Sequence, residues 1–247
     1  MDYKDYTIQN NSENYFWHKA RKKLIDNMLG SVFQNYDNNR LIFEIGCGTG
    51  YQMPVLEKYG KAEGLDINPN AVKVAIKNRL NVKVGDAEDS DFGSNKFEAA
   101  CLFDALEHIK NDSHVVKKIY SCLKNNGFLF LTVPSYNFMF SEHDRAMGHF
   151  RRYNKRELLS MLKNNGFEVI KSGYWNFLLF PAVLAMRLFK NFLRLFIKEK
   201  INKPESSNPH PLLNNLFYKG LMLENFLIKK NISFPFGVSL FVVARKP

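Results

Sequence analysis

Acidic and histidine side chains that could move a proton gather in the segment Asp104-Ala-Leu-Glu-His-Ile109 of this 247-residue sequence. The segment contains Asp104, Glu107 and His108. Histidine has an ordinary pKa suited to proton transfer near neutral pH, so His108 is a candidate general base or hydrogen-bonding group at a reacting atom. Capping and packing at a helix start is the alternative interpretation of the same side chain.

A second segment, residues 141–153, is dense in histidine and arginine. Its guanidinium groups, on Arg151 and Arg152, could clamp a phosphate or carboxylate of a substrate. The alternative is a basic loop whose arginines pair with acids at a sheet edge. An aromatic loop precedes the segment, and we expect Tyr136 in that loop to contact the substrate. The candidate catalytic groups of the segment are His143, His149 and Tyr153.

A glycine turn follows a short apolar strand, residues 41–45, and places Gly46, Gly48 and Gly50 at alternate positions. Residues without a Cβ can adopt φ > 0 and let a ligand approach the backbone closely. The next residues, 51–59, are predicted to form a helix that tolerates Pro54 in its first turn. Strand, glycine turn and helix together begin a nucleotide-binding α/β fold, whereas an ordinary tight turn is the alternative.

The elements after this turn repeat the same alternation. We predict strands over 62–66, 81–84, 96–103, 127–133 and 167–173, with helices over 68–79, 111–123 and 155–165 between them. Strands that alternate with helices at this rhythm indicate a parallel sheet with helices on both faces. The second strand ends at Asp66, about twenty residues after Gly46, where an acid accepts hydrogen bonds from ribose hydroxyls.

These motifs occur in the order seen in a known family. Glu44-Ile-Gly-Cys-Gly-Thr-Gly50, Gly64-Leu-Asp-Ile-Asn-Pro69, Gly85-Asp-Ala-Glu88 and Phe103-Asp-Ala-Leu-Glu-His-Ile109 resemble the motifs of class I S-adenosylmethionine (SAM) dependent methyltransferases of the broad small-molecule type. The resemblance covers about residues 40–175, and the tail, 235–247, looks like the family's last strand. It implies a Rossmann-like, seven-stranded, mostly parallel sheet with one reversed strand.

The resemblance also implies that SAM is the cofactor. Asp86 would then accept a hydrogen bond from the adenine amine, and the Ala87 N–H would donate to the ring. Arg21 lies in a predicted helix, 14–33, that either packs on the core or covers the cofactor as a lid. The residues that we expect to contact SAM are Glu44, Gly46, Cys47, Gly48, Asp66, Ile67, Asp86, Ala87, Phe103 and Arg21.

Asp104, Glu107 and His108 resemble the E-x-x-E-H stretch of ubiquinone-type O-methyltransferases, in which such residues can hold a divalent ion. Aspartate in place of the first glutamate shortens that arm. We therefore expect no metal, and keep these three side chains as the alternative ligand set.

We expect a single domain. Its parts are an N-terminal helical segment, 1–36, a SAM-binding core, 37–173, a basic amphipathic helical insertion, 174–234, and a last strand, 235–247. Residues 181–230 carry nine basic and three acidic side chains, a net charge of +6 out of +11 for the chain. The apolar run 175–186 is shorter than the roughly twenty residues that span a bilayer.

Three interpretations of the insertion stay open. Its helices, predicted over 181–198 and 212–230, either pack on each other or on a second copy, cover a hydrophobic or lipid-linked acceptor, or lie on an anionic membrane surface. The oligomeric state is left open. Residues 1–6 lack the pattern of a signal peptide, and Cys47, Cys101 and Cys122 show no metal or redox spacing. We therefore expect a cytoplasmic location, with a peripheral position at the inner membrane face as its variant.

The predicted function is SAM-dependent methyl transfer to a small-molecule or lipid- or glycan-linked acceptor. The charge of +11 raises a nucleic-acid methyltransferase as an alternative, but F-D-A-L-E-H stands where amino-group DNA methyltransferases carry a Pro-Pro-aromatic motif. Nucleic acid is therefore not an expected partner. A non-catalytic membrane- or protein-binding module is a further alternative. A dinucleotide-dependent dehydrogenase is least favoured, because Tyr51 stands where its third glycine would fall.

Overall fold

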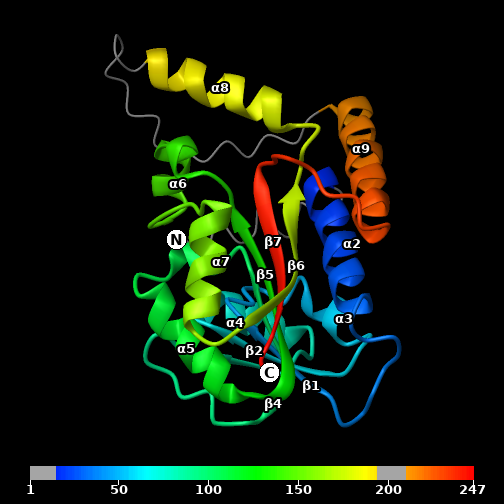
Figure 1. The fold of residues 1–247 in the computed structure, drawn as a ribbon, viewed down its shortest axis with the longest axis vertical. Coiled ribbons are helices and arrows are strands. Elements are labelled where there is room, and N and C mark those ends of the chain that lie inside the picture. The colour runs from blue at the N-terminus through cyan, green and yellow to red at the C-terminus, as the bar shows by residue number, and fades with distance from the viewer. Residues whose placement is uncertain (1–14, 194–209) are drawn as a thin grey trace.

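Seven strands form one sheet in the computed structural model, which describes residues 15–193 and 210–247 (Figure 1). The strand order is β3-β2-β1-β4-β5-β7-β6. All neighbours pair in parallel except β7, which is antiparallel to both β5 and β6. The predicted seven-stranded sheet with one reversed strand is therefore confirmed. The strands are β1 (Leu41–Ile45), β2 (Lys61–Asp66), β3 (Val82–Val84), β4 (Phe97–Phe103), β5 (Leu123–Pro134), β6 (Glu168–Trp175) and β7 (Ser239–Arg245).

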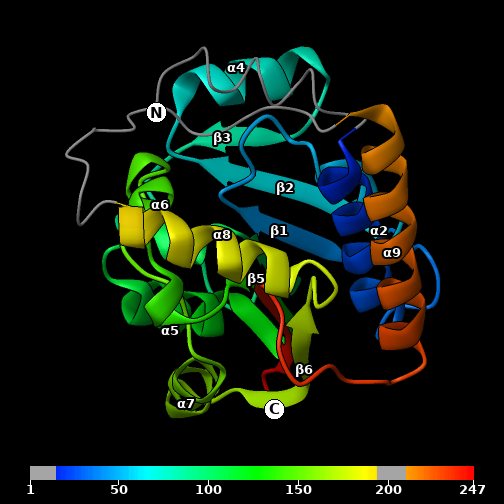
Figure 2. The same ribbon diagram turned by 90° about the horizontal axis from the view of Figure 1, so that it is seen from above.

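Helices cover both faces of the sheet, as the alternation of strands and helices predicted (Figures 1 and 2). One face packs against α5 and α7 through residues such as Phe43, and the other packs against α2, α3 and α9 through residues such as Ile42. Adjacent strand residues thus serve opposite cores, because side chains alternate along a strand. The helices are α2 (Phe16–Gly30), α3 (Met53–Leu56), α4 (Pro69–Lys77), α5 (Asp112–Cys122), α6 (Glu142–Ala146), α7 (Lys155–Asn164), α8 (Phe180–Leu193) and α9 (Pro211–Lys229), with 3₁₀ turns at η1 (Leu106–His108) and η2 (Asn137–Met139).

The helix after the glycine turn is shorter than predicted. Residues 51–59 were expected to be helical, but α3 covers only Met53–Leu56. The backbone N–H of Tyr59 bonds to the carbonyl of Leu56, three residues back, so the helix tightens and ends. Gly60 then passes so close to the chain that a Cβ there would lie 2.5 Å from the carbonyl oxygen of Arg40. The chain turns into β2 at that point.

The insertion between β6 and β7 contains α8 and α9. Helix α9 packs on α2, which lies between α9 and the sheet in both views (Figures 1 and 2). The Asn225 side-chain amide donates to the carbonyl of Ala20 at 2.8 Å, and the buried Glu224 carboxylate accepts the N–H groups of Phe177 and Leu178 at 3.0 and 2.8 Å. Those contacts join α9 to α2 and to the segment before α8.

Part of the insertion lies outside the described residues, namely Arg194, Lys198 and residues 201–209 of the polar linker expected over 201–211. Within the described part of the chain, no helix is both long enough and apolar enough to cross a membrane.

Candidate functional site

The glycine turn after β1 requires glycine. Gly46, Gly48 and Gly50 have φ values of +75°, +56° and +79°. A Cβ on Gly46 would lie 2.5 Å from the Cβ of Ala105, which follows β4, and one on Gly50 would overlap the side chain of Leu80. The turn therefore combines left-handed backbone with close packing, and both features exclude larger residues.

Asp66 is held against this turn. Its Oδ2 accepts the Gly48 N–H at 2.7 Å, and its Oδ1 accepts the Asn68 N–H at 2.8 Å. Burial raises the pKa of Asp66, and the two backbone hydrogen bonds oppose that rise. Each carboxylate oxygen accepts more than one hydrogen bond, so Asp66 can also receive ligand hydroxyls. Beside it, Ile67 leaves 65% of its surface exposed, which provides an apolar contact for a flat ring.

Asp86 closes its own turn. Its Oδ1 accepts the N–H of Glu88 at 2.8 Å, and the carbonyl of Ala87 accepts a hydrogen bond from Lys118 at 2.9 Å. These bonds hold the loop after β3 in one conformation. Phe103 is buried at the end of β4, and Cys47 is buried in the turn, where a Cβ on Gly64 would lie 2.8 Å from its Sγ. Burial raises the pKa of the Cys47 thiol, so this side chain fills space in the turn.

Buried polar atoms without partners accompany the turn and the end of β4. Within residues 15–193 and 210–247 they include Arg21 Nε, Glu44 Oε2 and Gln52 Oε1. The Arg21 Nη2 lies 2.9 Å from Asp104 Oδ2, which places the N-terminal helix over the carboxyl end of β4. Because buried polar groups in proteins are normally hydrogen-bonded, these atoms fit a ligand that carries both an ammonium and a carboxylate group.

We expect Glu44 to make the stability of the ligand-free protein depend on pH. Burial raises the pKa of Glu44 to about 8 from 4.5, with Arg21 opposing the rise and Asp66 adding to it. The folded protein then binds a proton that the unfolded chain releases, so the free energy of unfolding falls as pH increases from about 4.5 to about 8, by up to about 5 kcal/mol. Urea unfolding across this range, compared between the wild type and Glu44→Gln, measures the effect.

The control for this prediction is Glu57→Gln, since Glu57 is exposed. That variant should keep the wild-type slope of stability against pH, whereas Glu44→Gln should flatten it. Parallel curves for the wild type and Glu44→Gln would contradict the prediction.

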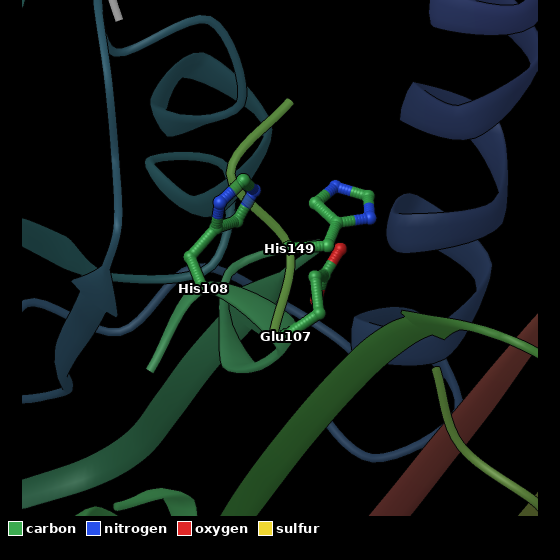
Figure 3. Close-up of side chains that lie close together, drawn as sticks. All are labelled: Glu107, His108 and His149. Atoms are coloured by element: carbon green, nitrogen blue, oxygen red, sulfur yellow. The ribbon is translucent and has the colours of Figure 1, made fainter. Parts of the chain in front are cut away.

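Glu107, His108 and His149 form a cluster in which each offers a ligand atom within 4.8 Å of the others (Figure 3). Glu107 is 1% exposed and both of its carboxylate oxygens lack partners. Burial and the Asp104 carboxylate raise its pKa. The two imidazoles meet edge to face, with ring centroids 4.6 Å apart. Packing around His108 and the neighbouring His149 lower the pKa of His108, so its ring stays neutral near pH 7.

His149 is oriented by Asp144. Its Nδ1 lies 3.1 Å from Asp144 Oδ1. Because a carboxylate only accepts, Nδ1 carries the hydrogen, and the neutral ring keeps a lone pair on Nε2. In Figure 3 the Glu107 carboxylate points toward the His149 ring. The arrangement is a carboxylate–imidazole pair beside a second, buried carboxyl group, which suits proton transfer.

Asp144 is fully buried and is the centre of a charged network. It accepts hydrogen bonds from Arg152 at 2.8 Å and from Arg187 of α8 at 2.7 Å, and Ser141 adds its N–H at 2.8 Å. Burial alone would raise the pKa of Asp144, but the hydrogen bonds from His149 and Arg152 and the two guanidinium charges hold it well below its usual range. Asp144 is therefore an anion at neutral pH that joins α6, α8 and His149.

Both arginines of the predicted substrate clamp are already paired with acids of the chain. Arg152 is 5% exposed and is bonded to Asp144, while Arg151 lies 2.9 Å from Asp112. The Tyr153 hydroxyl donates to Asp112 at 2.8 Å, and burial, followed by the Asp112 charge, raises its pKa. Both arginines thus pair with acids of the chain, but these acids lie in α6 and α5 and not at a sheet edge, and the predicted roles of the three side chains toward a substrate stay predictions.

Other predicted residues take separate positions. His143 is exposed and is not among the three residues of the cluster. Tyr136, with φ of +64°, stacks on Tyr174 at a centroid distance of 5.4 Å. Asp104, part of the alternative metal ligand set, is bonded to Arg21 and Thr132, so His149 rather than Asp104 joins Glu107 and His108.

Three site residues were not predicted. Gln52 is buried with an unpartnered amide oxygen, Thr132 connects Arg21 to Asp104 at 3.4 and 3.2 Å, and Asp144 orients His149. Only Asp144 had a signal, because Ser141 and Asp144 have the spacing of a capping box. That motif explains the bond from the Ser141 N–H to Asp144 Oδ2. It does not predict the contacts of Asp144 Oδ1 with His149 and Arg152.

A family model described as a methyltransferase domain matches residues 16–172, which is more than half of the chain. An uncharacterized protein of Methanocaldococcus jannaschii is 36% identical over 97 residues, covering 38% of this chain and 37% of that protein. A ubiquinone biosynthesis O-methyltransferase of Coxiella burnetii is 23% identical over 136 residues, covering 50% of this chain and 58% of that enzyme. The matches therefore span about two fifths and three fifths of those relatives.

The fold is also found in solved structures. Phosphoethanolamine N-methyltransferase 2 of Haemonchus contortus, in complex with S-adenosyl-L-methionine, superposes with a TM-score of 0.58 at 19% identity. The superposition covers 89% of this chain and 51% of that one. At this identity the similarity shows a common fold.

Proposed function

This chain belongs to the methyltransferase domain family, as its resemblance to class I SAM-dependent enzymes predicted, and we propose that it transfers the methyl group of SAM to a small-molecule acceptor. The observation that carries the proposal is the family match over residues 16–172 together with Asp66, whose carboxylate is held at 2.7 Å from the Gly48 N–H. A relative named as an O-methyltransferase and a neighbour solved with SAM support it.

The chain's own residues fit SAM. We assign Asp66 to the ribose hydroxyls, with Ile67 and the loop of Asp86 and Ala87 at the adenine. The unpartnered atoms of Arg21, Glu44 and Gln52 fit the carboxylate and ammonium groups of the methionine part. SAM supplies a methyl group already activated by the sulfonium charge, so the protein has to position the acceptor and remove its proton where it has one.

His149 is the group that we assign to proton removal. Asp144 holds its Nδ1–H, which leaves Nε2 to accept the acceptor's proton, and the Asp144 charge stabilises the imidazolium that results. His108 is a weaker base than an ordinary imidazole, because its pKa is lowered. Glu107 lies beside both rings with unpartnered oxygens and can hydrogen-bond the acceptor. Arg152 and Arg187 are positioning residues, since they act on His149 through Asp144.

Glu107, His108 and His149 also fit a divalent cation, since one carboxylate and two neutral imidazoles are donors that such ions accept. In that case the ion would hold the acceptor oxygen, and His149 would be a ligand. The Asp144–His149 contact suits either role, because a metal-bound histidine commonly donates its other N–H to a carboxylate. We favour proton transfer, in agreement with the sequence analysis. The His149 experiment in the Discussion distinguishes the role of a base from that of a metal ligand.

The acceptor that we propose carries an apolar group, as a lipid-linked molecule or an aromatic metabolite does. Tyr136 stacks on Tyr174 and contacts Phe180, and Phe138 beside it leaves 62% of its surface exposed. Tyr136 and Phe138 follow β5, whereas Tyr174 lies at the end of β6 and Phe180 at the start of α8. We assign this aromatic surface to the apolar group of the acceptor.

Calorimetric titration with SAM and S-adenosylhomocysteine tests the cofactor assignment. We expect micromolar binding by the wild type and at least about 100-fold weaker binding by Asp66→Ala, which removes two charge-assisted hydrogen bonds to the ribose. Asp89→Ala, at an exposed site, is the matched control and should bind as the wild type does. Failure of the wild type to bind either ligand, or full binding by folded Asp66→Ala, would contradict the proposal.

A further inference from the structure

One face of α9 carries a continuous stripe of exposed residues. Leu212, Leu216, Leu223 and Phe226 are 75%, 62%, 56% and 56% exposed. With Lys219 and Lys230, also exposed, they follow one another at intervals of three and four residues, which places them on one side of the helix. The opposite side, with Leu221, Glu224, Asn225 and Ile228, is buried. We call the six exposed residues the α9 stripe.

We propose that the α9 stripe docks on an anionic lipid surface. Large apolar side chains exposed in a row mark an interaction site, since scattered single residues are the ordinary case. In both views α9 is the outermost helix on its side of the molecule (Figures 1 and 2). This surface is independent of the residues that we assign to methyl transfer.

The charges of α9 indicate that the partner surface is negative. Lys219 and Lys230 belong to the stripe, and Lys229 is exposed next to it. The acid of this helix, Glu224, is buried and accepts the backbone N–H groups of Phe177 and Leu178. The exposed side of α9 therefore carries lysines and no acid. Leucine and phenylalanine at the acyl boundary, with lysine reaching the headgroups, are typical of helices that lie in the membrane interface.

A second copy of the chain fits this stripe less well. If two α9 helices packed against each other antiparallel, Lys219 would face Leu223 and Lys230 would face Leu212. The lysines would lose water and gain no acidic partner, because the stripe contains none. Anionic headgroups supply the missing negative charge, which is why lipid is the occupant that we propose.

Co-sedimentation of the full chain with vesicles tests the proposal. We expect binding to vesicles that contain 30% phosphatidylglycerol, weakened by salt, and no binding to pure phosphatidylcholine. The triple variant Leu216→Gln, Leu223→Gln, Phe226→Gln should lose at least tenfold in vesicle affinity, and so should Lys219→Ala, Lys230→Ala. Ile76→Gln removes an equally exposed apolar side chain from α4 and should bind as the wild type does.

Three outcomes would overturn the proposal. These are no binding of the wild type to anionic vesicles, binding that neither set of variants weakens, and a dimer in light scattering that the triple variant converts to a monomer without lipid, which would identify a second copy as the occupant. Calorimetry with SAM should give the same affinity for the wild type and both variants. A failure of cofactor binding would therefore be seen separately from a failure of the lipid surface.

Discussion

We expect His149→Ala to lower kcat for methyl transfer by about 10²- to 10⁴-fold, which is the range for loss of a positioned general base. The Kd for SAM should stay unchanged, because His149 contacts Glu107, His108 and Asp144 and none of the residues that we assign to the cofactor. The measurement is single-turnover methyl transfer from labelled SAM to the acceptor, with the Kd for SAM from calorimetry. His149→Gln, which retains a polar side chain of similar reach, should not rescue the rate.

The control for this prediction is His114→Ala, because His114 is exposed at the start of α5, outside the cluster. Its rate should match that of the wild type. Wild-type activity that is abolished by a chelator and restored by a divalent cation would show that His149 is a ligand and not the base. A rate for His149→Ala within a few-fold of the wild type would contradict both assignments.

Asp144→Asn should lower the free energy of unfolding by about 3–5 kcal/mol, which is the usual cost of removing one partner from a buried ion pair. The substitution leaves two guanidinium groups without a counter-charge. Arg152 is 5% exposed, and the side chain of Arg187 is also mostly buried. It also removes the acceptor that fixes the His149 ring. Urea unfolding at pH 7 measures the loss. Asp89→Asn, at an exposed site, should stay within about 0.5 kcal/mol of the wild type.

Asp144 should also make the free energy of unfolding decrease at acid pH. The pKa of Asp144 in the folded protein lies below its value in the unfolded chain, so its contribution is present above about pH 4 and is lost as the pH falls further. Asp144→Asn should flatten that decrease. Two results would contradict this account. One is the same decrease of stability at acid pH in Asp144→Asn as in the wild type, and the other is a loss of less than about 1 kcal/mol in the free energy of unfolding at pH 7.

A double substitution tests whether Asp144 acts through His149. If it does, adding Asp144→Asn to His149→Ala lowers kcat no further, because the orienting group has nothing left to orient. The comparison is made below the unfolding transition of both variants, so that stability does not enter the rate. Additive losses would show that Asp144 has a separate role in the reaction.

The cofactor half of the site could be predicted from the sequence because it is local. Gly46, Gly48 and Gly50 directly follow β1, and Asp66 ends β2, so adjacent parallel strands place them together. The backbone angles and the Gly48–Asp66 hydrogen bond then follow from the residue types. The predicted helix over 51–59 was too long, since nothing in those residues shows how closely Gly60 passes Arg40.

The acceptor half could not be predicted in this way. His108 follows β4 and His149 follows α6, and only the packing of these loops brings their rings to 4.6 Å. Arg151 and Arg152 have the composition of an anion clamp, yet each pairs with an acid of the chain, and the buried guanidinium of Arg152 requires such a counter-charge close by. Arg187 of α8 also bonds to Asp144, although it lies 35 residues after Arg152 in the sequence.

The sequence by itself determined the family, the order of elements and the groups that we assign to SAM. Hydrophobic periodicity and glycine at alternate positions act over a few residues, and the parallel sheet then aligns the strand ends. Only the tertiary structure decided which ionisable groups are free to react. Asp144 pairs with both Arg152 and Arg187 in the interior, whereas both carboxylate oxygens of Glu107 lack partners within the described residues. That division depends on burial and on contacts between distant segments, which residue type and spacing do not encode.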